Sequence, residues 1–126
     1  MMRCLLLLAL SLGAGCGREP AAPEHAEAAY RRYCASCHGL GGGGDGPAAA
    51  AMTPPPSKLT TSKLNLMDLM QVIDGRRAVR AHGNSLMPVW GQVFEQGGED
   101  DRRARQALRE VQALAEYVQV LQSRGR

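Results

Sequence analysis

The segment Cys34-Ala35-Ser36-Cys37-His38 constrains this chain more than any other feature of its sequence. Two thiols three positions apart can each form a bond to one of the two vinyl groups on a porphyrin edge. The histidine that follows directly can then place an imidazole nitrogen below the porphyrin iron. The C-x-x-C-H pattern therefore predicts one covalently attached c-type haem, held through Cys34 and Cys37, with His38 as the proximal ligand of the iron.

Two other kinds of site also use a C-x-x-C pair, and the surrounding sequence favours neither. A zinc ribbon needs a second cysteine pair or a distant histidine pair, and none follows Cys37. A thioredoxin-like dithiol opens a helix after a strand, whereas the residues upstream of Cys34 have a helical pattern. Haem attachment is the preferred interpretation, and absence of covalent haem would restore the other two.

The first fifteen residues have the pattern of an export signal and are set aside from the fold. Arg3 supplies a short positive region, an apolar run follows from Leu5 to Leu12, and Gly13-Ala14-Gly15 suit a peptidase. The apolar run is shorter than the ~20 residues that a membrane-spanning helix needs. We therefore expect a signal peptide over residues 1–15 and an exported, periplasmic protein, because c-type haem is attached outside the bacterial cytoplasm.

Cys16 follows these small residues and predicts a lipoprotein, in which this cysteine becomes the lipidated first residue of the mature chain. The match is incomplete, because Gly13 stands where such signals usually carry leucine. Ordinary cleavage would leave an odd free thiol on an exported protein, which is usually avoided. We expect lipidation at Cys16, a tether over residues 16–23 and a membrane-anchored domain over residues 24–126, with a soluble periplasmic protein as the alternative.

The size and charge of the chain agree with a cofactor-binding domain. About 110 residues remain after cleavage, and the aromatic residues are one Trp, three Tyr and one Phe. A domain of this size is marginal on its own chain, so a buried haem would supply apolar mass. The formal net charge is +3, and no dense basic patch with interleaved aromatic residues indicates nucleic acid binding.

Helical periodicity predicts the regular elements, and the sequence shows no strand pattern. We expect helices over residues 24–37, from residue 59 or 60 to residue 74 with Gly75 as the C-cap, and over residues 101–123. Within the second helix, the residues expected to pack rather than to bind iron are Leu64, Met67, Met70 (or Leu69) and Ile73. The Gly-, Ala- and Pro-rich residues 39–56 are expected to lie along one haem edge, since glycines let backbone approach a flat ring.

Four features in this order resemble the class I c-type cytochromes, the small bacterial monohaem kind. They are Tyr30 four residues before the first haem cysteine, the C-x-x-C-H motif, Met87-Pro88-Val89-Trp90-Gly91 about fifty residues downstream, and the amphipathic last helix. The resemblance covers about residues 25–123. It implies an all-α cytochrome c fold, in which three to five short helices surround one covalently bound haem.

The same resemblance implies a role for several residues of the haem pocket. Met87 is the distal axial ligand of the iron, and Pro88 stiffens the strap that carries its sulfur. Trp90 packs at the haem and offers its indole N–H to a propionate. A backbone carbonyl at Pro47 accepts a hydrogen bond from the second ring nitrogen of His38.

The sequence departs from the family pattern in two places, and one histidine is an alternative to Met87 as the distal ligand. Ala26 stands where many relatives have glycine at the crossing of the first and last helices, beside Tyr30. The segment 94–103 is longer and more charged than usual and is expected to be an exposed insertion. His82 is the alternative distal ligand, and bis-His ligation would give a lower potential. His25 is expected to be exposed.

The function implied by the resemblance is single-electron transfer between redox proteins. An iron with both axial positions filled offers no open site, so neither enzyme activity nor a small-molecule substrate is expected. One alternative is a fixed haem subunit of a larger membrane oxidoreductase, and another is a haem sensor or peroxidase with a labile distal ligand. Arg76, Arg77 and Arg80 suggest a basic rim for an acidic partner, or else a solvated loop or contacts to the haem propionates.

Overall fold

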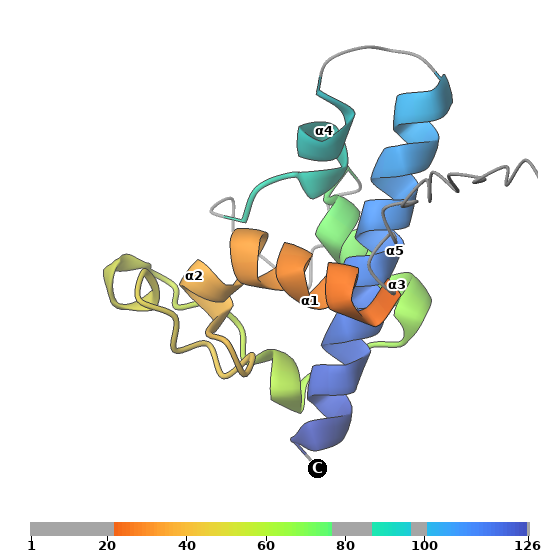
Figure 1. Ribbon diagram of the computed structural model, residues 1–126. Coiled ribbons are helices and arrows are strands. Elements are labelled where there is room, and N and C mark those ends of the chain that lie inside the picture. Colours follow the sequence, from red (N-terminus) through yellow and green to blue (C-terminus); the bar gives the residue numbers. More distant parts are fainter. Residues whose placement is uncertain (1–21, 77–86, 97–100, 126) are drawn as a thin grey trace, which may run out of the picture.

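The computed structural model describes residues 22–76, 87–96 and 101–125, and these are helical without any strand (Figure 1). The α-helices are α1 (Ala22–Tyr33), α2 (Ala35–His38), α3 (Leu66–Asp74), α4 (Trp90–Glu95) and α5 (Asp101–Arg124). Two short 3-10 turns, Ala49–Ala51 and Leu59–Thr61, lie in the long connection between α2 and α3. The expected all-α fold is confirmed. None of the helices in this part of the chain is long and apolar enough to cross a membrane.

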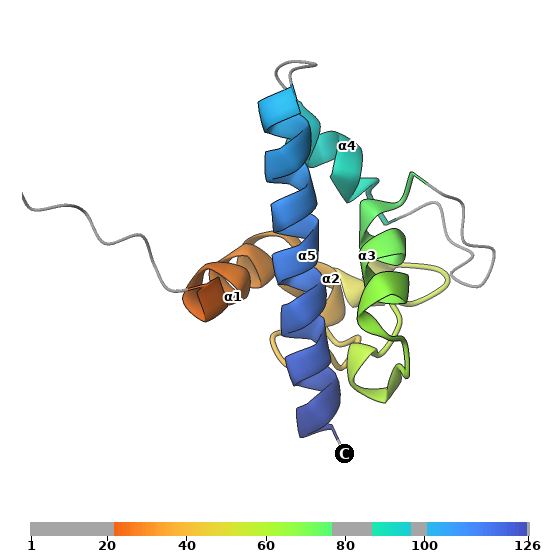
Figure 2. The same cartoon turned by 90° about the vertical axis from the view of Figure 1, so that its right-hand side faces the viewer.

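Helix α5 is the axis against which the other elements pack. Helices α1, α3 and α4 and the turn Leu59–Thr61 all contact it directly, and α1 crosses it steeply while α3 covers another side (Figure 2). This arrangement follows from apolar residues three and four positions apart, which form one continuous stripe. The buried members of that stripe are Ala107, Val111, Leu114, Ala115, Val118 and Leu121.

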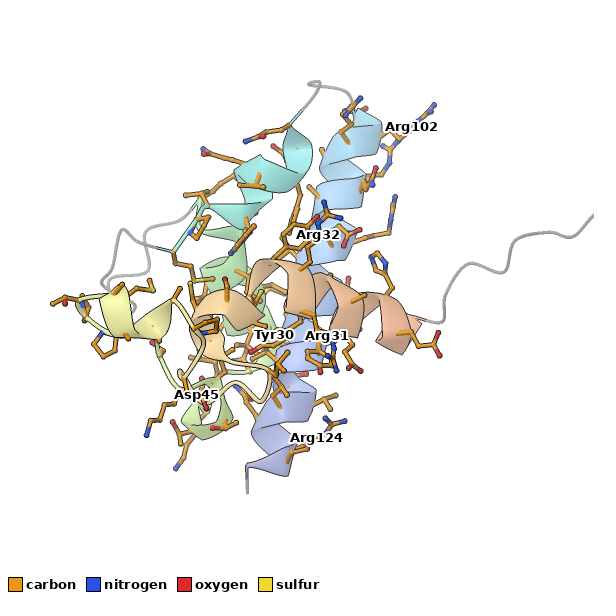
Figure 3. All side chains as sticks on the ribbon, turned by 60° about the vertical axis from the view of Figure 1, so that its left-hand side comes forward. Tyr30, Arg31, Arg32, Asp45, Arg102 and Arg124 are labelled. Carbon is orange, nitrogen blue, oxygen red and sulfur yellow. The ribbon has the colours of Figure 1, made fainter. Side chains whose placement is uncertain are left out.

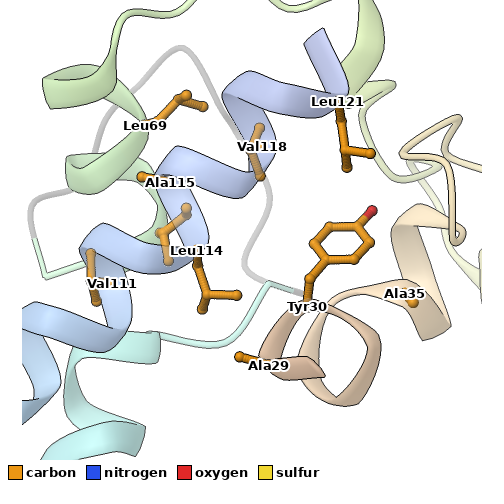
Figure 4. Packing of buried hydrophobic residues seen from close by; sticks show 10 residues of the cluster. Ala29, Tyr30, Ala35, Leu69, Val111, Leu114, Ala115, Val118 and Leu121 are labelled. Carbon is orange, nitrogen blue, oxygen red and sulfur yellow. The ribbon is translucent and has the colours of Figure 1, made fainter. Parts of the chain in front are cut away.

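The crossing of α1 and α5 is filled by Tyr30. Its side chain is completely buried and points towards Leu114 and Leu121 of α5 (Figure 4). Its ring centre lies 5.1 Å from that of Tyr117. Ala26, one turn earlier on α1, is also buried, so the crossing accommodates the methyl group that replaces the usual glycine.

Two predicted helices differ from the observed ones at their ends. The helix expected over residues 24–37 is interrupted at Cys34, which separates α1 from α2. The helix expected from residue 59 or 60 begins only at Leu66, because Asn65 caps it: the Asn65 side chain accepts a hydrogen bond from the Asp68 amide at 3.0 Å. Its predicted end is confirmed, since Gly75 is left-handed with φ 70°.

Two further expectations about packing need correction. On α3, Met67 is 62% exposed, so its expected packing was wrong, whereas Leu69, the alternative to Met70, and Ile73 are buried. The segment from residue 94 is not an exposed insertion at its start, because Phe94 packs against the core from α4. The sequence pattern did not predict α4. The last helix is confirmed, with one residue added at its C-terminal end.

Candidate haem site

The C-x-x-C-H residues form one turn of helix at the junction of α1 and α2. The Cys34 amide donates to the Tyr30 carbonyl at 2.9 Å, and the His38 amide donates to the Cys34 carbonyl at 2.9 Å. Residues three apart on a helix lie on one face, so this turn places Cys34 and Cys37 on the same side. Both cysteines are free and partly buried. Two free thiols on one face followed by an imidazole are the donors that a c-type haem requires.

The state of the Cys34 thiol argues against a dithiol redox site. Burial, with a smaller contribution from Cys37, raises the pKa of Cys34 to about 12. A catalytic thiol needs a pKa lowered towards neutrality, and the pKa of Cys34, the first cysteine of the motif, is moved in the opposite direction. Among residues 22–76, 87–96 and 101–125, no group of three or more His, Cys, Asp or Glu side chains could hold a metal ion, which leaves the zinc interpretation without support there.

The ring of His38 is oriented by a backbone carbonyl. Its Nδ1 lies 3.0 Å from the carbonyl oxygen of Ser57. An Nδ1–H that donates to this oxygen leaves Nε2 without a proton, so that its lone pair is free to bind a metal. The resemblance implied that the Pro47 carbonyl would accept this hydrogen bond. In the structure the acceptor is the Ser57 carbonyl instead.

The path of the glycine-rich loop after His38 explains why Ser57, and not Pro47, lies beside the His38 ring. The loop folds back on α2 through amide donors: Gly44 to the His38 carbonyl at 2.8 Å and Ala48 to the Ser36 carbonyl at 2.9 Å. Pro47 is left exposed on the outside of this turn. The chain then returns so closely that a Cβ on Gly44 would lie 2.8 Å from the Pro56 carbonyl oxygen, which brings Ser57 beside His38.

The loop is held tightly at Gly46 and at Gly39. A Cβ at Gly46 would lie 2.6 Å from the Ala35 carbonyl oxygen, and closer still to that of Ser36. The Tyr30 hydroxyl donates to the Gly39 carbonyl at 2.7 Å, which ties the loop to the core. Figure 3 shows Tyr30 inside the molecule, and the Asp45 carboxylate lies against Gly39 and Gly43 of the loop.

Met87 and Trp90 lie on the core side of the α4 region. Both are partly buried and pack against the buried cluster, whereas Pro88 is exposed. The Trp90 ring is stacked on Phe94 at 5.6 Å and lies 5.4 Å from the Tyr33 ring. Tyr33 belongs to the last turn of α1, next to Cys34, so this aromatic group links α4 to the C-x-x-C-H turn.

A set of apolar side chains remains partly exposed around the core. Its members are Tyr33, Cys34, Leu59, Leu64, Leu66, Met70, Met87, Trp90, Phe94 and Tyr117. The set includes one of the two cysteines and Met87, and apolar surface of this kind suits a flat apolar macrocycle. The donors and their surroundings therefore fit a haem.

Several predicted residues are placed differently or not at all. Cys16, Arg77, Arg80 and His82 lie outside the described residues. Arg76 is not free for an acidic partner, because it bonds the carboxylates of Asp74 and Glu95. His25 is largely exposed, as expected, and lies 3.0 Å from the Glu110 carboxylate.

The sequence reasoning missed the roles of Ser57 and of the Asp74–Arg76–Glu95 group. A backbone carbonyl carries no side-chain signal, so nothing in the sequence marked Ser57. The acids and the arginine were visible as charges, but their pairing depends on how α3 and α4 meet.

Comparison with known proteins gives one family. The family model described as "Cytochrome C oxidase, cbb3-type, subunit III" matches residues 21–106. This match begins next to the start of α1 and ends within α5. Searches among curated proteins and among solved structures found no significant match.

Proposed function

The chain belongs to the family of cbb3-type cytochrome c oxidase subunit III, a family of c-type cytochrome domains, and on this premise we propose that it carries single electrons on one covalently attached haem c. In this proposal Cys34 and Cys37 hold the haem, and His38 and Met87 are the axial ligands of the iron. The observation that carries it is the C-x-x-C-H turn itself: two free thiols on one face, followed by an imidazole whose Nδ1 lies 3.0 Å from a carbonyl oxygen.

Each of these residues has a task that its chemistry explains. The cysteines prevent dissociation of the cofactor. His38, fixed by Ser57, presents Nε2 in one orientation, and such outer contacts raise the basicity of a ligand. Met87 supplies a soft thioether, which favours reduced iron and raises the potential relative to two imidazoles. Pro88 limits the backbone freedom of the strap, and Trp90 shields the site and offers its indole N–H to a propionate.

Electron transfer without substrate turnover follows from this ligand set. When bound, the haem supplies an iron that changes between Fe(III) and Fe(II). With His38 and Met87 both bound, no coordination site remains open, so we do not assign an enzyme activity to this chain alone. The partners are redox proteins, one as donor and one as acceptor.

A second candidate is a fixed haem subunit of a larger membrane oxidoreductase. The family description, which names an oxidase subunit, favours this candidate. Purification from mild detergent separates the two: a permanent subunit co-purifies with other chains in fixed ratio, whereas a mobile carrier elutes alone.

We also propose an exported protein on the periplasmic side of a bacterial membrane, anchored by lipid on Cys16. The support is the sequence pattern of residues 1–15 and the need of c-type haem for export. In the Cys16→Ser variant, haem protein should move from the membrane to the soluble periplasmic fraction. Unchanged membrane attachment would refute the lipid anchor.

The test of the ligand set is the optical spectrum of the periplasmically matured protein. We expect covalent c-type bands and, in the oxidised protein, the weak far-red band of iron–methionine bonding. The Met87→Ala variant should lose that band, and its reduced form should bind carbon monoxide, whereas the parent should not. Covalent haem without the far-red band in the parent would move the assignment to His82 or to an open, sensor-like iron.

A further inference from the structure

One arginine joins the end of α3 to the end of α4. Arg76 follows the C-cap Gly75 directly, and its Nη2 and Nε donate to Asp74 Oδ1 at 2.7 and 2.9 Å. Its Nη1 donates to Glu95 Oε1 at 2.7 Å. One planar guanidinium thus bonds two carboxylates in different directions, a geometry that lysine cannot reproduce. We call Asp74, Arg76 and Glu95 the ionic clasp.

The clasp lies directly over the segment that begins with Met87. Gly91 is buried, and a Cβ there would lie 2.8 Å from Arg76 Nε and closer still to Asp74 Oδ1. A second contact lies two residues earlier in the strap, where a Cβ on Gly75 would be 3.1 Å from the Val89 Cα. The end of α3 therefore touches the strap 87–91 at two places, and Gly91 is required because the clasp occupies the space of a side chain.

The clasp joins elements on either side of the strap. Asp74 and Arg76 stand at the end of α3, and Glu95 lies beyond the strap, at the end of α4. The three side chains are 24%, 41% and 30% exposed, so their bonds are only partly screened by water.

From these contacts we propose that the ionic clasp positions the Met87 sulfur for the iron, with Arg76 as the positioning residue. The inference rests on the proposed His38/Met87 ligation and adds the device that holds the second ligand. A thioether is a weak ligand, and its occupancy depends on how firmly the strap is held in place. Loss of a group that bonds a ligand directly typically weakens metal binding by 10–100-fold; the clasp acts on Met87 through Gly91 and Val89, so we expect an effect at the lower end of that range.

A purely structural ion pair makes a different prediction. Exposed pairs contribute little to stability, so their loss lowers the unfolding midpoint slightly at most and does not change the iron ligand. Arg31 provides the matched control, because its Nη2 bonds Glu27 Oε1 at the same 2.7 Å on the surface of α1.

The experiment compares Arg76→Gln, Arg76→Lys, Glu95→Gln and Arg31→Gln as holoproteins. We measure the far-red iron–methionine band, the reduction potential and the rate of carbon monoxide binding to the reduced protein. For Arg76→Gln we expect a weaker band, a lower potential and carbon monoxide binding on the order of tenfold faster. Arg76→Lys should rescue only part of the loss, and Arg31→Gln should match the parent.

The possible outcomes separate the clasp from the ligand assignment. A parent protein that lacks the far-red band refutes Met87 as ligand and the clasp with it. A parent with the band and an Arg76→Gln variant with unchanged band, potential and binding rate refutes the clasp alone, even where the unfolding midpoint falls. Glu95→Gln keeps the bonds between Arg76 and Asp74, so it replaces Arg76→Gln if that variant does not fold. It should change the band, the potential and the carbon monoxide binding rate in the same directions as Arg76→Gln, but less.

Discussion

Two side chains of the C-x-x-C-H region are held by backbone carbonyls from elsewhere in the chain. The Tyr30 hydroxyl donates to Gly39 at 2.7 Å, and His38 Nδ1 lies 3.0 Å from the Ser57 oxygen. Both carbonyls belong to the loop that follows α2. The orientation of the His38 imidazole therefore depends on the loop, and the loop depends on the buried tyrosine.

The Tyr30→Phe variant should lose about 1 kcal/mol of unfolding free energy at neutral pH, because a buried hydrogen bond is removed and the Gly39 carbonyl keeps only the bond from the Gly42 amide. The loss is measured by denaturant unfolding of the holoprotein. Burial is the main cause that raises the pKa of Tyr30 above its ordinary value in the folded state.

The same pKa gives the tyrosine a pH signature. The unfolded chain releases the phenolic proton near pH ~10, before the folded protein does, so the unfolded state is favoured increasingly above that pH. The parent's free energy of unfolding should exceed that of Tyr30→Phe by a constant amount below pH ~10. This excess should shrink as the pH rises above ~10. A difference that stays constant from pH ~8 to ~11 would contradict this account.

Two glycines of the loop should respond differently to the same substitution. Gly46→Ala places a Cβ against the carbonyls of Ala35 and Ser36, so the loop or α2 must move, at a cost of about 1–3 kcal/mol. Gly41→Ala is the control, because a Cβ there has no atom within 4 Å. Thermal unfolding and the haem spectrum should change for Gly46→Ala only. Equal effects of the two would mean that the close approach at Gly46 does not govern the loop.

At the scale of helices, α3 shows how a short polar residue sets a boundary. Asn65 accepts from the Asp68 amide at 3.0 Å and donates its own side-chain amide to the Asp68 carboxylate at 2.7 Å. The first of these bonds satisfies one of the backbone donors that the first turn of a helix leaves unpaired, and the second fixes the capping side chain. The chain before Asn65 is therefore extended, although its apolar spacing also fits a helix.

The Asn65→Ala variant should destabilise the holoprotein by about 1 kcal/mol, because the cap is lost. Asn65→Ser retains an oxygen that can accept from the same amide and should recover most of that loss. The measurement is the denaturant midpoint of the parent, of Asn65→Ala and of Asn65→Ser. If alanine and serine were equivalent, the start of α3 would be set by packing on α5 and not by its cap.

The sequence allowed α5 to be predicted almost to the residue, because its apolar stripe is continuous and belongs to one helix. It also allowed Cys34, Cys37 and His38 to be proposed as the haem residues, since they lie within five positions and haem attachment requires that order. The break at Cys34, the cap at Asn65 and the partner of His38 escaped prediction, because each is decided by hydrogen bonds that several local sequences could make. The clasp escaped it because Arg76 and Glu95 meet only after α3 and α4 have packed.

For the molecule as a whole, one helix organises a small core. The core depends on α5, and its largest fully buried side chains are Tyr30, Leu114 and Val111. The arginines labelled in Figure 3 lie on the outside, on α1 and at both ends of α5. The apolar side chains around Met87 and Trp90 are only partly covered by protein, so the fold needs further apolar contact on that side.

A domain built in this way should depend on its haem for stability. A macrocycle that covers roughly 150 Å² of apolar protein surface contributes about 4 kcal/mol at ~25 cal/mol per Å². That amount is a large part of the stability of a small domain. The double variant Cys34→Ala/Cys37→Ala, which cannot attach haem covalently, should therefore unfold at a much lower temperature and less cooperatively, while α5 retains part of its helix.

Circular dichroism of the double variant, followed during heating and alongside haem absorbance, tests this dependence. Ser36→Ala is the control, because it changes an exposed side chain in the same turn and leaves both thiols in place. The control should keep its haem and its sharp transition. A haem-free double variant with the parent's midpoint and cooperativity would show that the α1–α5 crossing at Tyr30 and the stripe of α5 are sufficient, and that the haem contributes its electron chemistry without holding the fold together.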